Sequence, residues 1–381
     1  MTVPPADLET PCLVLDRARL ERNCARMKAK MARLGLALRP HIKTAKCAEV
    51  ADLACDDGRR LTVSTVAEAR FFAERGFADI VYAVGLVPAK VGPLKAIAAA
   101  SGTRIAGIVD TAAAAEAVAS AAAALGFVLP LHIEIDTGDG RGGVLPDDPE
   151  LEAIAAVLRD RDGVAPAGVL THAGQSYRCH SVDDVRAVAE DERGGVAAAA
   201  ARLRAAGFVC PAVSAGSTPT ATHAESGTGL TEMRPGVYVF GDLDQMALGS
   251  CAYDDIAVTV LASVIGHNRQ QGHILIDAGG LALSKDISAG DFLDRVGYGW
   301  LADPDTDGGA PIDNLYVAGV SQEHGVVRAK DGGAVDFDRY PVGSRLRVVP
   351  NHVCMTAAAY DRYHVLAGNS VDTWSRAVGW Y

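Results

Sequence analysis

The sequence predicts an α/β protein, a (β/α)₈ TIM barrel followed by a mostly β domain. Its 381 residues, 49% of them hydrophobic, are enough for a large barrel and a second domain. From about residue 36 to residue 240, short apolar runs alternate with alanine-rich stretches of helical periodicity. After about residue 245, strand-like runs and Gly- and Asp-rich turns replace the helical stretches. An open doubly wound sheet is the competing architecture, disfavoured because no Gly-x-Gly-x-x-Gly follows an early strand.

Eight apolar runs are the candidate barrel strands, as expected for a TIM barrel. They are Leu36–Lys43, Leu61–Val66, Ile80–Gly85, Arg104–Asp110, Leu129–Asp136, Ala167–Ala173, Ala212–Ser217 and Met233–Phe240. Later strands are expected at Asp255–Ile265, His273–Asp277, Asn314–Val320 and Arg345–Val349. We therefore predict a barrel over residues 16–245 and a β domain over residues 246–381, which residues 1–15 can join through the strand Cys12–Leu15.

Composition excludes several classes of function. The chain has 36 basic and 47 acidic residues, a net charge of −11, which argues against general binding to nucleic acid or anionic membranes. No signal peptide and no apolar run long enough to cross a bilayer is recognisable. Eight scattered cysteines without a CxxC pair indicate reduced thiols. The expectation is a cytoplasmic protein.

The first candidate strand ends in a lysine that can carry chemistry. In Arg39-Pro40-His41-Ile42-Lys43, side-chain alternation puts Arg39, His41 and Lys43 on one face. If that face points inward, Lys43 lies near the C-terminal mouth, where barrel enzymes place their active sites. An ammonium there needs an anion, or must become neutral, and an imine with a phosphate-bearing aldehyde meets both needs. A surface lysine at a strand end is an equally good interpretation of this strand alone.

Two later strand ends add groups suited to a flat anionic cofactor. The seventh strand runs into Gly216-Ser217-Thr218-Pro219-Thr220, whose hydroxyls and backbone N–H groups suit a phosphate, or simply cap a helix. The fifth and sixth strands lead to Arg141, His172 and Tyr177 at the same predicted mouth. Each of these three could also be an ordinary loop or core residue.

The late segment Pro350-Asn351-His352-Val353-Cys354 is a candidate metal motif. On a strand, His352 and Cys354 would point the same way and could bind one ion. Imidazole with thiolate favours Zn²⁺. Two ligands are too few for a structural zinc but leave positions for water and substrate oxygens. A buried cysteine beside a chance histidine is the alternative.

Together these motifs resemble the eukaryotic-type D-serine dehydratase and D-threonine aldolase group of fold-type III pyridoxal-phosphate enzymes, which have alanine-racemase-like barrels. The resemblance covers essentially the whole chain. It rests on Arg39–Thr44, Thr171–Gly174, Gly216–Thr220, Gln322–Gly325 and Pro350–Cys354. The dehydratases of the group carry His-x-Cys and Gly-Ser-Thr-Pro-Thr, as this chain does, so the match is closer to them than to the aldolases.

The resemblance implies specific roles. Lys43 would carry pyridoxal 5′-phosphate, the Gly216–Thr220 loop would hold its phosphate, and His352 and Cys354 would bind Zn²⁺, with Mn²⁺ or another divalent ion as the alternative. His41 would belong to the same cofactor site. A homodimer is implied as well.

The expected reaction is dehydration of a D-3-hydroxy amino acid to a 2-oxo acid and ammonia, with D-serine, D-threonine and D-threo-3-hydroxyaspartate as candidate substrates. Lys43 would take the α-proton and the metal would make the β-hydroxyl a better leaving group. The first alternative is D-threonine aldolase chemistry, which breaks the Cα–Cβ bond to give glycine and an aldehyde. A racemase would leave the metal motif without a role. A non-catalytic pyridoxal-phosphate carrier is the alternative outside enzymes.

Overall fold

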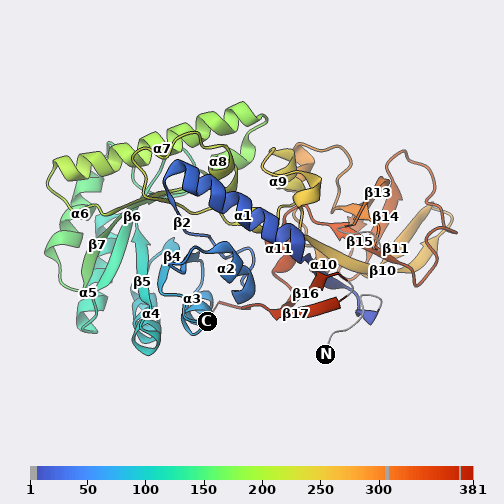
Figure 1. Cartoon of the computed structure of the whole chain (residues 1–381), viewed down its shortest axis with the longest axis horizontal. Coiled ribbons are helices and arrows are strands. Elements are labelled where there is room, and N and C mark those ends of the chain that lie inside the picture. Colours follow the sequence, from blue (N-terminus) through green and yellow to red (C-terminus); the bar gives the residue numbers. More distant parts are fainter. Residues whose placement is uncertain (1–6, 305–308, 369, 381) are drawn as a thin grey trace. The chain divides into compact units, whose positions relative to one another are not determined.

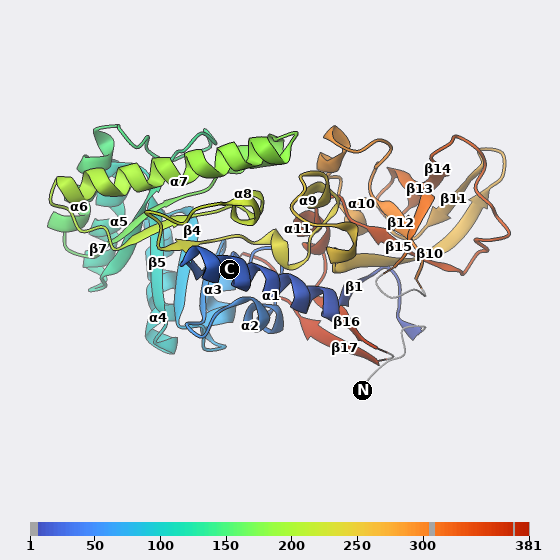
Figure 2. The same cartoon turned by 45° about the horizontal axis from the view of Figure 1, so that its top comes forward.

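The computed structural model describes residues 7–304, 309–368 and 370–380, which divide into two compact units. One unit comprises residues 26–236 and 379–381, and the other comprises residues 1–25 and 237–378. Both are drawn in Figure 1 and, from a second side, in Figure 2. No helix in the described ranges is both long and apolar enough to span a membrane.

The first unit is the predicted barrel, so the fold class is confirmed. Its eight parallel strands are hydrogen-bonded in the order β2-β9-β8-β7-β6-β5-β4-β3. A parallel bridge between His41 and Thr62 links the two ends of this sheet and nearly closes it. The strands are β2 (Ala37–Leu38), β3 (Arg60–Val63), β4 (Asp79–Gly85), β5 (Arg104–Val109), β6 (Leu129–Ile135), β7 (Val164–Thr171), β8 (Ala212–Ala215) and β9 (Glu232–Met233).

Helices lie on the outside of these strands (Figure 1). Hydroxyl side chains start four of them, since Thr65, Thr111, Ser181 and Ser217 each accept a hydrogen bond from a first-turn backbone N–H. The helices that follow barrel strands are α2 (Ala48–Ala54), α3 (Val66–Ala73), α4 (Pro88–Ser101), α5 (Ala112–Ala124), α6 (Glu150–Asp160), α7 (Val182–Ala205) and α8 (Thr218–His223). Helix α1 (Arg17–Leu34) precedes the first barrel strand.

Two expected barrel strands are much shorter than the apolar runs that predicted them. The ladder expected over Leu36–Lys43 ends at Leu38, and the one expected over Met233–Phe240 ends at Met233. Pro40 and Pro235 follow these strands, and proline has no N–H to donate to a ladder. Residues Val237–Val239 form a 3₁₀ turn, η3, instead of strand.

The second unit is built on a nine-stranded, mostly antiparallel sheet in the order β11-β14-β13-β12-β15-β10-β1-β16-β17. Strand β1 pairs antiparallel with β10, so the start of the chain belongs to this sheet. Its strands are β1 (Cys12–Asp16), β10 (Val258–Asn268), β11 (His273–Ile276), β12 (Trp300–Ala302), β13 (Pro311–Val320), β14 (Gly325–Ala329), β15 (Arg345–Val349), β16 (Arg362–Ala367) and β17 (Ser370–Ser375). Short helices connect them: α9 (Leu243–Ala247), α10 (Gly280–Leu283) and α11 (Val353–Ala357).

Candidate functional site

Lys43 lies in the turn after His41, and its side chain is exposed. The shared face expected for Arg39, His41 and Lys43 does not form, because regular strand ends at Leu38 and the alternation stops there. Arg39 is instead buried in the barrel, where its Nε lies 2.9 Å from the Glu232 carboxylate. Lys43 is accessible because it lies in the turn that follows the strand, where its side chain is exposed.

Two neutral histidines and three cations gather at this end of the barrel. Burial lowers the pKa of His41 well below its usual range, and the charges of Lys43 and Arg234 lower it further. Burial also lowers the pKa of His172 to about 3, with Lys43, Arg141 and Arg234 adding to the effect. The structure therefore brings together the predicted residues His41, Lys43, Arg141 and His172 in a region of positive potential, which suits an anionic ligand.

The loop after β8 is dense in buried hydroxyl groups. Gly216 has a φ of +109°, a conformation that favours glycine, and Ser217 and Thr220 form a capping box that starts α8. Ser217, Thr218 and Thr220 are at most 1% exposed. The backbone N–H groups of Gly216, Ser217 and Thr220 donate to protein side chains, which differs from the expectation that they turn toward an anion. The hydroxyl protons can reorient, and they fit a phosphate group.

The turn after β7 is joined to this loop. His172 hydrogen-bonds to the backbone of Gly216, and the Ser176 and Ser217 hydroxyl oxygens are 2.8 Å apart. The Tyr177 ring lies on the same turn, in the 3₁₀ helix η2 (Gly174–Arg178), with its centroid 6.3 Å from that of His172. Arg141 is exposed, and its Nη2 is 3.4 Å from Oε1 of Glu134.

Two buried residues of this region were not predicted. Arg234 is 6% exposed and donates to the Ser214 hydroxyl and the Thr171 carbonyl, each at 2.5 Å. Glu192 is fully buried on α7. The sequence did contain a signal for Arg234, which is a charged residue within the apolar run of a candidate barrel strand, two positions after Glu232. Glu192 lies in an ordinary polar stretch of helix and carried no such signal.

His352 and Cys354 belong to the second unit and are not on a strand. His352 is the N-cap of the short helix α11, which contains Cys354. The strand geometry expected for this pair is therefore wrong, since Val353 donates its N–H to the buried Asp242 carboxylate and the helix begins there. The two side chains still meet, because His352 and Cys354 hydrogen-bond to each other.

Asp286 anchors His352. Its Oδ2 lies 2.8 Å from Nδ1 of His352, so a metal ion bound to this ring would be held through Nε2. Burial opposes the charge on His352, but the hydrogen bonds to Asp286 and Cys354 outweigh it and raise the pKa of His352 to about 11. The same bond to His352 is the main reason that the pKa of Asp286 falls to about 2. A carboxylate that accepts from the second nitrogen is the usual partner of a metal-binding histidine.

Two further carboxylates lie close to His352. Burial raises the pKa of Asp242 to about 7 and that of Asp244 to about 6, while the charge of His352 lowers both. No three His, Cys, Asp or Glu side chains in the described ranges are placed to hold one metal ion together. Within those ranges, this cluster offers an imidazole and a thiol as a pair of protein ligands.

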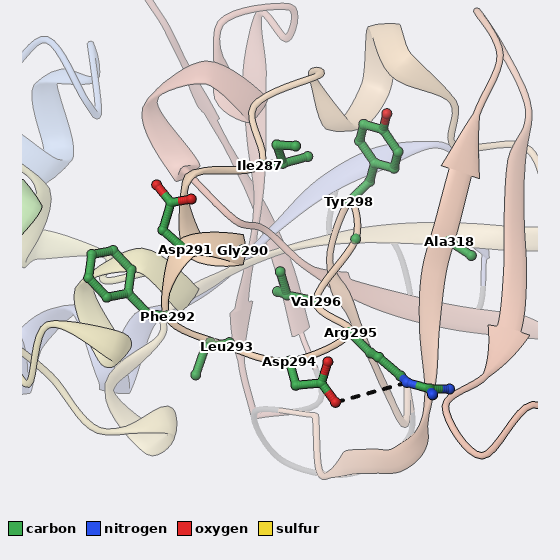
Figure 3. Close-up of a pocket in the computed structure, with 11 residues that line it drawn as sticks. Ile287, Gly290, Asp291, Phe292, Leu293, Asp294, Arg295, Val296, Tyr298 and Ala318 are labelled. Atoms are coloured by element: carbon green, nitrogen blue, oxygen red, sulfur yellow. Dashed lines mark ion pairs between the residues drawn. The ribbon is translucent and has the colours of Figure 1, made fainter. Parts of the chain in front are cut away.

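A separate hollow of about 520 Å³ lies on the loop that follows Asp286 (Figure 3). It is lined by residues from Ile287 to Tyr298 together with Ala318. Asp294 and Arg295 form an ion pair at its edge, at 3.9 Å. None of the predicted site residues lines this hollow, so it provides no further support for any of them.

The chain matches the models of two known protein domains. The model of the alanine racemase N-terminal domain matches residues 15–244, and the model of a serine dehydratase domain matches residues 257–366. The chain is 43% identical to D-threo-3-hydroxyaspartate dehydratase of Delftia sp. strain HT23, over 98% of each chain. It is 30% identical to D-serine dehydratase of Dictyostelium discoideum, over 94% of each chain. It is also 30% identical to an Arthrobacter D-threonine aldolase, over 97% of this chain and 93% of that one.

The solved structure of the Delftia enzyme superposes with a TM-score of 0.95 at 42% identity, covering 99% of this chain and 100% of that one. A cysteine-to-alanine mutant of that enzyme was solved in a metal-free form. The match to the racemase domain spans more than half of the chain, and the match to the Delftia enzyme spans nearly all of it. This chain therefore belongs to the alanine-racemase-like, fold-type III pyridoxal-phosphate family, in the group that contains the D-threo-3-hydroxyaspartate and D-serine dehydratases.

Proposed function

We propose that this protein is a dehydratase that removes the β-hydroxyl of a D-3-hydroxy amino acid and releases a 2-oxo acid and ammonia. D-threo-3-hydroxyaspartate is the first substrate to test, since the Delftia relative is named for it, and D-serine and D-threonine follow. The observation that carries the proposal is the His352–Cys354 pair anchored by Asp286. An imidazole and a thiol as the only two protein ligands would leave coordination positions on a catalytic Zn²⁺ for water and substrate oxygens.

Pyridoxal 5′-phosphate, when bound, supplies the electron sink that stabilises negative charge at the α-carbon. Lys43 would hold the cofactor through its ε-amine and then take the α-proton of the substrate, for which its exposed position in the turn after His41 is suited. His41 and His172 stay neutral at physiological pH and contribute hydrogen bonds without adding charge. The hydroxyl groups of Ser217, Thr218 and Thr220 would hold the phosphate.

A divalent ion on His352 and Cys354 would act as a Lewis acid toward the leaving hydroxyl. Asp286 would hold the His352 ring in the orientation that presents Nε2. The metal-free form of a cysteine-to-alanine mutant of a D-threo-3-hydroxyaspartate dehydratase, 42% identical to this chain, supports a thiol ligand. Zn²⁺ fits this thiol-containing pair better than Mg²⁺ or Ca²⁺ does.

The family resemblance also supports a homodimer, which light scattering of the purified protein would measure. None of the eight cysteines, which all lie in the described ranges, is in a disulfide. Reduced thiols are typical of cytoplasmic proteins and support that location.

Product analysis tests the proposed reaction. Zinc-loaded protein with bound cofactor is incubated with D-threonine, D-serine or D-threo-3-hydroxyaspartate, and the products are separated. The expected products are the 2-oxo acid and ammonia. Lys43→Ala should lower turnover by about 10²- to 10⁴-fold, the usual contribution of a proton-transfer group, or by more because cofactor attachment is also lost.

Other products would identify the alternatives. Glycine with an aldehyde would show that the protein is an aldolase and that the dehydratase proposal is wrong. Cofactor binding without turnover of any of the three substrates would indicate a carrier of pyridoxal phosphate.

A further inference from the structure

Glu192 is a buried carboxylate behind the two loops that are proposed to hold the cofactor, and the proposed mechanism does not use it. It lies in the middle of α7 with 0% exposure. Its Oε1 accepts two backbone hydrogen bonds, one from Ala173 and one from Gly216, each at 2.9 Å. These donors follow different barrel strands, β7 and β8, so one oxygen atom holds the starts of two active-site loops.

The loops that Glu192 joins contain most of the predicted cofactor contacts. The first loop runs from His172 through Tyr177, and the second contains the hydroxyl groups from Ser217 to Thr220. They also contact each other directly, through His172 and the Gly216 backbone and through the hydroxyl groups of Ser176 and Ser217. The contacts between the loops do not involve Glu192, so they can keep the first loop in place when the support of Gly216 by Glu192 is removed.

The charge of Glu192 is only partly compensated within the barrel, so its pKa is raised overall. Burial raises its pKa, and the hydrogen bonds from Thr220, Gly216 and Ala173 act in the opposite direction, as does the charge of Arg234. Truncating the side chain would leave two buried N–H groups without an acceptor, a more disruptive change than losing a contact at the surface. Helix α7 lies close enough to the ends of β7 and β8 for one side chain to accept from both N–H groups.

We infer that Glu192 is a positioning residue that sets the shape of the loop from Gly216 to Thr220 and thereby gives the barrel its preference for the phosphorylated form of pyridoxal. This inference rests on the proposed function, in which that loop holds the phosphate and Lys43 holds the aldehyde carbon. Glu192 acts from behind the loop and does not touch the cofactor. Its removal should therefore weaken recognition of the phosphate and leave attachment at Lys43 intact.

The test compares pyridoxal phosphate with pyridoxal, which lacks the phosphate. Apo-protein is titrated with each compound, and the visible absorbance of the lysine-bound form gives Kd. In Glu192→Ala, the Kd for pyridoxal phosphate should rise at least about tenfold, while the Kd for pyridoxal should change less than about threefold. Glu190→Gln is the matched control, because Glu190 is an exposed residue on the same helix that pairs with Arg193.

The results distinguish the inferred role of Glu192 from a purely structural role and from failure of the proposed function. Equal losses for both compounds, or no loss for either, would show that Glu192 only supports the fold and would overturn the inference. Thermal melting of the apo-protein separates that structural effect from the change in affinity. If Glu192→Ala does not fold, Glu192→Gln takes its place, with an expected selective loss of at least about threefold. Absence of lysine-bound cofactor in the unsubstituted protein would overturn the proposed function itself.

Discussion

At the scale of single residues, the candidate sites are organised by carboxylates placed behind the groups that would carry the chemistry. Glu192 holds two loops by their N–H groups, and Asp286 holds the ring of His352. Neither carboxylate was predicted from the sequence. Both show that the geometry of a site depends on groups that do not themselves contact the ligand.

Asp286 gives a prediction on metal binding. Asp286→Asn removes the charge that fixes the His352 ring and should lower the affinity for Zn²⁺ by about 10- to 100-fold, as loss of such a partner commonly does. Competition with a chromogenic chelator measures the affinity directly, without reference to turnover. Asp291→Asn is the control, because Asp291 is exposed on the same loop (Figure 3). Unchanged zinc affinity in Asp286→Asn would show that the hydrogen bond does not support the metal site.

The sequence identifies Lys43, His352 and Cys354 as candidates because each belongs to a short local motif. It could not predict Asp286, which lies 66 residues before its partner, or Glu192, which reaches Gly216 from 24 residues away. Such pairs depend on tertiary contacts, which a single sequence does not reveal.

At the scale of elements, the periodicity predicted the eight barrel strands and the helices, but not where each one ends. The strands at Ala37–Leu38 and Glu232–Met233 are cut short, and His352 starts a helix in place of continuing a strand. In each case a local hydrogen-bonding feature decides the boundary: a proline without N–H, or a buried carboxylate that accepts from Val353. Apolar runs predict burial, and the backbone hydrogen bonds then set the length of an element.

Helix α7 carries two adjacent glycines that should behave oppositely. A Cβ added at Gly195 would lie 2.8 Å from the Thr137 methyl carbon, whereas one added at Gly194 would meet nothing within 4 Å. Thr137 cannot rotate away freely, since its hydroxyl oxygen is 2.8 Å from that of Thr171. Gly195 therefore permits the close approach of α7 to the strand ends.

Alanine substitutions at Gly194 and Gly195 test whether the close approach of α7 requires a glycine at position 195. Gly194→Ala should stabilise the protein by up to about 1 kcal/mol, the intrinsic gain of alanine over glycine in a helix. Gly195→Ala should destabilise it by about 1–2 kcal/mol, because overpacking costs more than that gain. Thermal melts of the two variants beside the unsubstituted protein give the signs. Stabilisation by both changes would show that the contact with Thr137 relaxes at little cost.

At the scale of the whole molecule, the barrel interior contains a network of charges within an otherwise apolar core. Arg39 bonds to Glu232 and to Asp79, and Arg234 lies near Glu232 and two further carboxylates, those of Glu192 and Glu134. Apolar clusters such as the one that contains Val81, Ala106 and Leu170 were expected from the strand pattern. The charged network was not expected, because the pattern of apolar residues does not show which polar side chains of a barrel strand point inward.

His132 on β6 lies in this network and gives a prediction on pH. It is 3% exposed, and burial lowers its pKa from the ordinary value near 6.5 to about 3. The folded protein therefore leaves His132 neutral in the range where the unfolded chain binds a proton, so stability present above pH 6.5 is lost as the pH falls toward 3. Between pH 7.5 and pH 5.5 this one group should cost about 1 kcal/mol of the free energy of unfolding. Urea unfolding at the two pH values should show a loss about 1 kcal/mol larger in the unsubstituted protein and in the surface control His180→Gln than in His132→Gln, since His41 and His172, whose pKa values are also lowered, contribute equally to all three. An equal dependence on pH in all three would mean that His132 takes up its proton within the folded barrel, with the carboxylate of Glu232 as the group that accommodates the charge.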